Sequence, residues 1–218
     1  MHVFLLESKS WEKLDNTKLT QEEIRNILLA AGEEACQELD YDPQYINVIF
    51  KPNLPYVRRR TGVGGSAFDS EMLDMTFDPT LPYGVDKCKE YLRDGVFHEV
   101  SHVVHYAFQP KVEDILFWVV AEGLAVVFER LKADANHPWN DYEKDETMRQ
   151  WFYELKTASD PNSEKWYAQH PDGRTNIAYK TGAWIVDRAL KNSDKSIKGL
   201  TRMNYQEIIK LSAISDQL

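Results

Sequence analysis

Three histidines and a glutamate fall within eight positions of the segment RDGVFHEVSHVVHYAF, residues 93–108. On an α-helix, side chains four residues apart point in nearly the same direction, so His98 and His102 would lie one turn apart and could hold one metal ion. Neutral imidazole is a good ligand for zinc. Glu99 would point about 100° away from His98, which makes it a poor co-ligand but lets it reach a water at the metal. The pattern His-Glu-x-x-His therefore predicts two metal ligands and a general base.

The alternative is an ordinary helix that carries these residues without any metal. The neighbours of the motif argue against it, because Val96, Phe97, Val100 and Val103 are apolar and predict a buried helix. Histidine and glutamate side chains that are buried need polar partners, and a metal ion would supply one.

A catalytic zinc usually takes three protein ligands, so a third must come from elsewhere in the chain. A metzincin would continue the motif with glycine at position 105 and histidine at 108, but this chain has His105 and Phe108. Glu122 is a better candidate, because it is the single carboxylate in the apolar run 116–128. A carboxylate in such a run is costly unless it is paired or binds a metal. Glu122 comes twenty residues after His102, which leaves room for a turn and an antiparallel second helix.

The segments HEVSH and AEGLAVVFER together resemble the gluzincin metallopeptidases. The second segment is similar to the glutamate helix of the leukotriene-hydrolase and zinc-aminopeptidase family. The whole chain most closely resembles a bacterial group of predicted zinc-dependent proteases, catalogued as a domain of unknown function. In that group a Gly-Gly strand precedes the two segments and a Y-x-x-G helix follows them, as GVGGSAF and YKTG do here. The resemblance covers roughly residues 45 to 190.

The resemblance implies a Zn²⁺ ion bound by His98, His102 and Glu122, with Glu99 as the general base. It also implies that Glu129 orients a ligand histidine from outside the ligand set. An ordinary salt bridge is the alternative for Glu129. His105 has no ligand counterpart in the family and is expected in the core or at the rim of the site.

Gluzincins also need a donor that stabilises the oxyanion formed during hydrolysis, often a tyrosine or histidine on a later helix. Tyr179 fits this role, since Gly182, Ala183 and Val186 follow it at helical spacing and place it on the face turned toward the core. His170, in the expected loop QHPDGRTN, is the competitor. A third possibility is that neither residue is the donor.

The order of the strands and helices expected along the chain predicts an α+β fold. A small N-terminal β-containing lobe is followed by a mainly helical lobe. We expect one domain, residues 1–218, in which the N-terminal α/β part covers about 1–85 and the helical part about 86–218. The resemblance implies a zincin-like arrangement with the motif helix at the cleft. Alternation predicts strands at 2–8, 46–50 and 71–77, and periodicity predicts helices at 19–39, 86–109, 112–133, about 144–157, 175–192 and 204–213.

The segment TGVGGSAF matches the dinucleotide-binding pattern G-x-G-x-x-A through Gly62, Gly64 and Ala67. No strand leads into it and no helix follows, so we interpret it as a turn before the strand at 71–77. The resemblance implies that an exposed strand near the zinc pairs with extended substrate, and glycines there would allow close approach.

The composition of the chain disfavours some classes of binding partner. With 35 acidic and 26 basic residues the net charge is −9, which disfavours nucleic acid and an anionic membrane surface. No apolar run is long enough to span a bilayer, and the N-terminus lacks a signal peptide, so we expect a cytoplasmic protein.

Cys36 and Cys88 should be free thiols, and Cys88 lies too far before His98 to be a ligand. The arginines 58–60 are expected in solvent or gripping a substrate carboxylate.

Taken together, the sequence predicts a zinc-dependent peptide hydrolase (a zinc metallopeptidase) that acts on a peptide or protein. One alternative is a zinc hydrolase of a small amide, and another is a non-catalytic binding domain stabilised by zinc. Glu99 favours the enzymes, because a structural zinc site has no use for a base and prefers a closed fourth ligand.

Overall fold

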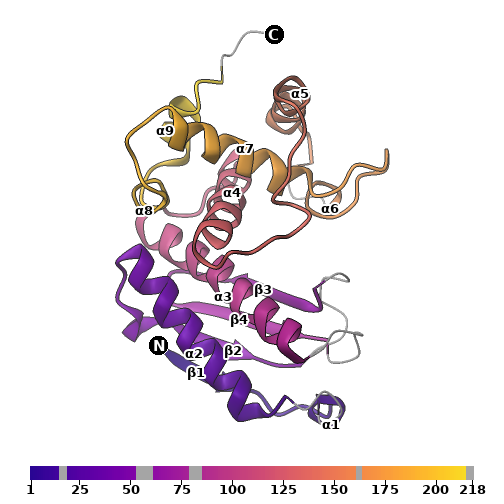
Figure 1. Cartoon of the computed structure of the whole chain (residues 1–218). Helices are drawn as coiled ribbons and strands as arrows, with labels where there is room; N and C mark the ends of the chain where they lie inside the picture. Colours follow the sequence, from indigo (N-terminus) through magenta and orange to yellow (C-terminus); the bar gives the residue numbers. More distant parts are fainter. Residues whose placement is uncertain (15–18, 53–60, 79–84, 161–163, 215–218) are drawn as a thin grey trace. The chain divides into compact units, whose positions relative to one another are not determined.

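The computed structural model describes residues 1–14, 19–52, 61–78, 85–160 and 164–214, and the chain divides into two compact units, 1–107 and 108–218. The first unit contains a four-stranded sheet with the order β1-β2-β4-β3 (Figure 1). Its strands are β1 (His2–Leu5), β2 (Asn47–Phe50), β3 (Val63–Ala67) and β4 (Met72–Phe77). β1 and β2, and β2 and β4, pair in parallel, whereas β3 pairs with β4 in antiparallel fashion at one edge.

Only one face of the sheet is buried, because the apolar residues alternate along the strands. That face carries Val3, Val48, Phe50, Leu73, Met75 and Phe77. On the opposite face Phe4 is 51% exposed, and Ile49, Asp74 and Thr76 are half-buried. The three strands predicted from alternation are confirmed, with β1 shorter than its predicted segment.

The prediction of a turn at TGVGGSAF was wrong, since residues 63–67 form β3. Gly64 pairs with Thr76, Gly65 with Met75 and Ser66 with Asp74. Glycine and serine have low strand propensity, so the segment gives no strand signal of its own. Pairing with β4 overrides that propensity, and the missing side chains bring the backbone of β3 close to its neighbours.

The two long helices of the first unit, α2 (Gln21–Leu39) and α3 (Val85–Phe108), lie along the sheet (Figure 1). The unit also contains the short helical segments α1 (Trp11–Leu14) and the 3₁₀ turn η2 (Pro43–Tyr45). α2 begins with the predicted capping box, in which Thr20 and Glu23 satisfy each other's backbone N–H groups. Figure 1 shows α2 and α3 running side by side over the strands, and a Cβ at Gly32 of α2 would contact Val96 of α3 at 3.7 Å.

The second unit is helical in its described part. It contains α4 (Ile115–Lys132), α5 (Asp145–Lys156), α6 (Glu164–Tyr167), α7 (Ile177–Lys191), α8 (Ile197–Thr201) and α9 (Tyr205–Leu211). The five helices predicted after residue 85 are confirmed to within three residues at each end. Side-chain caps explain two of the starts, because Asp114 accepts a hydrogen bond from the Leu116 N–H at 2.9 Å and Asn204 accepts one from the Gln206 N–H at 2.9 Å.

α4 and α7 cross at two glycines. A Cβ at Gly123 would lie 2.6 Å from Cα of Gly182 and closer still to its carbonyl group, and a Cβ at Gly182 would lie 2.8 Å from Cα of Gly123. Backbone therefore packs directly on backbone at this point. Gly123 belongs to the EGLA segment of the sequence and Gly182 to the Y-x-x-G segment. The close contact between the two helices gives a physical reason for glycine at each position.

The predicted α+β class is confirmed, with a small N-terminal sheet followed by a mainly helical region. Within the described residues, none of the helices is both long and apolar enough to cross a membrane. Cys36 and Cys88 are free and buried, and burial raises the pKa of the Cys36 thiol to about 12. The arginines 58–60 lie outside the described residues.

Candidate metal centre

α3 presents the two histidines of the motif on one face, as the four-residue spacing predicts. The rings of His98 and His102 are 5.0 Å apart between centroids and meet edge to face at 74°. His98, Glu99 and His102 are all buried, with 8%, 7% and 6% of their surfaces exposed. The ring of Tyr106 stacks on that of His102 at 5.8 Å and limits its rotation. His105 is fully buried, which fits the expectation of a core residue.

Glu99 lies against the edge strand β3. A Cβ built at Gly65 would be 2.6 Å from Cγ of Glu99 and 2.8 Å from its Oε1. The carboxylate therefore occupies the space that a side chain at position 65 would need. Gly65 is itself exposed, so the strand that adjoins the carboxylate is open to solvent.

Glu122 completes a set of three possible metal ligands. One ligand atom from each of His98, His102 and Glu122 lies within 4.8 Å of the other two, so these residues form a group that could hold a metal ion. Two imidazoles and one carboxylate are the donor set of many catalytic zinc sites, which leave one position open for water. The chemistry of the donors therefore fits the predicted zinc.

Tyr167 of α6 is a neighbour of Glu122 that the sequence did not single out. Burial raises the pKa of its hydroxyl group, and the negative charge of Glu122 raises that pKa further. The influence of Glu122 places the two residues in the same part of the second unit. Because α6 has only four residues, no hydrophobic period could have marked Tyr167 in advance.

Glu129, two turns after Glu122 on α4, is 2% exposed. Its Oε1 accepts a hydrogen bond of 2.8 Å from the indole N–H of Trp139, and the ring of His137 stacks on Trp139 at 4.7 Å. This bond helps to satisfy a buried carboxylate. The predicted role of Glu129 in orienting a ligand histidine stays a prediction.

The two candidates for the oxyanion donor have different surroundings. Tyr179 on α7 is 5% exposed, and its ring lies 6.1 Å from that of Trp139 and 6.2 Å from that of Tyr167. His170 lies in a loop after α6, where its Nδ1 is 2.8 Å from Oδ2 of Asp172. Tyr179 thus shares an aromatic cluster with Tyr167, whereas His170 is held in the turn by an acid.

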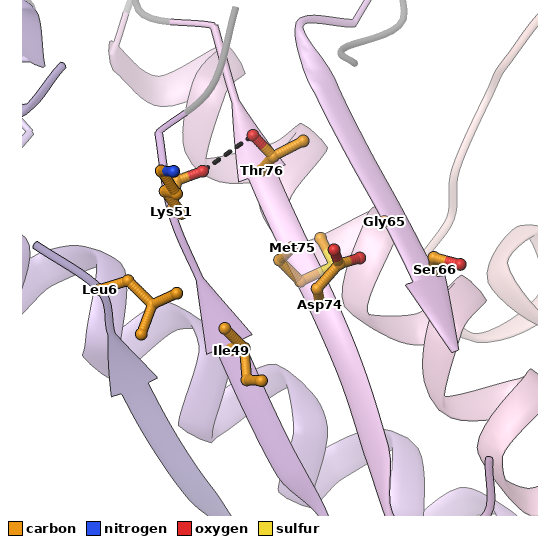
Figure 2. A pocket seen from close by; sticks show the side chains of 8 residues that line it. All are labelled: Leu6, Ile49, Lys51, Gly65, Ser66, Asp74, Met75 and Thr76. Carbon is orange, nitrogen blue, oxygen red and sulfur yellow. Dashed lines mark hydrogen bonds between the residues drawn. The ribbon is translucent and has the colours of Figure 1, made fainter. Parts of the chain in front are cut away.

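A cavity of about 390 Å³ is lined mainly by residues of the sheet and by Leu6, which follows β1. Figure 2 shows Leu6, Ile49 and Asp74 around it, with Gly65 and Ser66 of β3 along one side. Burial raises the pKa of the Asp74 carboxyl. The cavity therefore combines an apolar floor with one acidic group beside the edge strand.

Comparison with known proteins gives one match. The model of the family described as "Predicted Zn-dependent protease (DUF2268)" matches residues 46–210 of the chain. No curated protein and no solved structure matches it.

Proposed function

The chain belongs to the family of predicted Zn-dependent proteases, and we propose on that basis that it is a gluzincin-type zinc peptidase. The observation that carries the proposal is the group of His98, His102 and Glu122, beside a glutamate at the position of a general base. The family description supports zinc and proteolysis in general terms, and the grouping of the three side chains supports the proposed ligands.

Zinc, when bound, lowers the pKa of a coordinated water and polarises the carbonyl group of the substrate. Glu99 then takes the proton from the attacking water and passes it to the nitrogen of the leaving amine. Glu99 is 7% exposed, so bulk water has little access to the carboxylate that would take this proton. Its contact with β3 fixes the direction from which the proton is taken.

Tyr179 is our proposed donor to the oxyanion, as the sequence and the resemblance suggested, and Tyr167 is a second candidate. A tyrosine hydroxyl near the developing charge stabilises it only if it stays protonated, and burial together with Glu122 keeps Tyr167 protonated. Since Tyr167 is half-buried and Tyr179 is 5% exposed, Tyr167 has more freedom to reach a substrate.

The substrate we propose is an extended peptide segment that pairs with β3. Among the residues that the structure describes, this strand is at the edge of the sheet and pairs with one neighbour, β4, so its outer backbone groups can pair with another strand. Gly64 carries no side chain that would hinder such an approach. The carboxylate of Glu99 lies next to Gly65, so a peptide on β3 would run past the proposed base.

A zinc-dependent hydrolase of a small amide is the main alternative. The open edge of β3 favours a peptide, because a small amide has no backbone to pair with a strand. A non-catalytic domain stabilised by zinc is less well supported, since Glu99 is buried beside the ligands without being one of them.

The proposal is tested by loading the purified protein with zinc and measuring cleavage of a mixed set of quenched fluorogenic peptides. We expect one zinc per chain, cleavage of at least one peptide, and loss of that cleavage after chelation. A zinc-loaded protein that cleaves small acyl amides and none of the peptides would support the alternative hydrolase. A protein that binds zinc and cleaves neither would support the binding domain.

A further inference from the structure

Two glycines allow α3 to approach the sheet closely where Glu99 lies. A Cβ at Gly95 would lie 2.9 Å from Cε of Met75 and 3.1 Å from Cγ1 of Val63, so the missing side chain lets these two residues of the sheet pack against the helix backbone. Glu99 follows Gly95 by four residues and therefore points toward the same strands. The close approach of α3 to the sheet therefore places Glu99 against β3.

Gly65 provides the matching space on the strand. Val63, Gly65 and Ala67 face the helices, because Gly65 pairs with the inward-facing Met75 of β4. A Cβ at position 65 would lie 2.6, 2.8 and 2.9 Å from Cγ, Oε1 and Cδ of Glu99, distances that real Cβ atoms essentially never show. Three atoms of the glutamate therefore fill the volume that any other residue at position 65 would occupy.

We propose that Gly65 is the positioning residue of Glu99: its missing side chain fixes where the carboxylate of the base lies. This inference rests on the proposed function, in which Glu99 takes and passes the proton. The backbone of β3 cannot retreat freely, because it is hydrogen-bonded to β4 along its length. An alanine at position 65 must therefore push the carboxylate aside, and not the strand.

The displacement is large enough to affect catalysis. An ordinary contact begins at about 3.4 Å, so Cγ of Glu99 has to move by about 0.8 Å from its present 2.6 Å. A misplacement of about 1 Å at a reacting group can cost about 10²-fold in rate. The three atoms nearest to this methyl group all belong to Glu99 and none to a proposed zinc ligand, so metal binding should be retained.

The first experiment is a thermal double-mutant cycle on the zinc-free protein, with wild type, Gly65→Ala, Glu99→Ala and the double variant. We expect Gly65→Ala to lower the Tm when Glu99 is present, because the added methyl group overpacks the contact. In the Glu99→Ala background Cγ, Cδ and Oε1 are absent, so the same substitution should no longer lower the Tm. Equal changes in both backgrounds, or no change in either, would overturn the proposal.

A matched control is Gly199→Ala in α8, because a Cβ there would meet Ser196 Oγ at 3.6 Å, an ordinary contact. It makes the same chemical change without a clash and should shift the Tm equally in both backgrounds. A control that showed the same dependence on Glu99 would mean that the cycle reports a general effect and would count against the contact.

The second experiment measures kinetics on the fluorogenic peptide that wild type cleaves fastest. Gly65→Ala should lower kcat by about 10- to 100-fold with KM little changed and with one zinc per chain. If Gly65→Ala lowers the Tm but leaves kcat normal, Gly65 has a purely structural role and the proposal is overturned. If wild type cleaves nothing, the proposed function fails, and the thermal cycle alone decides whether Gly65 positions Glu99.

Discussion

Replacing Gly123 with alanine should separate α4 from α7 and weaken zinc binding. The new Cβ would lie 2.6 Å from Cα of Gly182 and closer still to its carbonyl group, so the helices must move apart by more than about 0.8 Å to reach an ordinary contact of about 3.4 Å. The clashing atoms belong to the backbone of α7. Backbone atoms within a helix cannot rotate away as a side chain can. The movement would carry Glu122, the adjacent residue and proposed ligand.

The size of the effect follows from two opposing terms. Overpacking of a close-packed contact costs about 1–3 kcal/mol, and more where nothing can yield. Alanine in place of glycine within a helix returns about 1 kcal/mol. A net loss of about 1–2 kcal/mol should lower the Tm of a chain of this length by roughly 2–8 °C. Disturbing the support of a metal ligand should also weaken zinc binding by about 10- to 100-fold.

The assay compares Gly123→Ala with Gly32→Ala by thermal unfolding without zinc and by zinc competition against a chromophoric chelator. Gly32 is also within a helix and its added Cβ would also clash, but with the sulfur and terminal methyl of Met1, a flexible side chain that can swing away. Gly32→Ala should therefore be neutral or mildly stabilising and keep normal zinc affinity. Equal Tm values for the two variants, or unchanged zinc affinity in Gly123→Ala, would refute the reasoning.

Three further predictions concern single side chains. Glu122→Ala should leave the fold largely intact and weaken metal retention, and elemental analysis that finds full zinc in this variant would remove Glu122 from the ligand set. Either Tyr179→Phe or Tyr167→Phe should slow peptide cleavage by about 10²–10³-fold with zinc retained, and wild-type rates in both would exclude a tyrosine donor. Hydrogen bonds from Arg174 lower the pKa of Glu154, so the stability they give is present above the unfolded pKa and lost as the pH falls through the folded one. Glu154→Gln should therefore flatten the fall of Tm on acidification, and an unchanged slope would contradict this.

The helices that carry the possible metal ligands could be predicted because their signals are local. The spacing of His98 and His102 determines that they share a helical face, and a single carboxylate in an apolar run marks Glu122 without any knowledge of the fold. Helix ends were predicted within three residues, since capping side chains such as Thr20 and Asn204 act on the next few backbone groups.

The remaining features depend on contacts between segments far apart in the chain. β3 forms because it pairs with β4, where Gly65 lies opposite Met75. The low strand propensity of VGGSA does not by itself predict this pairing. The parallel pairing of β1 with β2 likewise comes from tertiary packing. Tyr167 is close enough to feel the charge of Glu122 although 45 residues separate them in the sequence, and α6 is too short to show which way it faces.

The proposed role of Glu99 as the base is tested most directly by one measurement. Glu99→Gln keeps the shape of the side chain but cannot accept the proton, so peptide cleavage is compared between wild type and this variant at equal zinc content. We expect one zinc per chain in both proteins and a rate at least about 10²-fold lower in the variant. Cleavage at the wild-type rate by zinc-loaded Glu99→Gln would contradict the proposed mechanism.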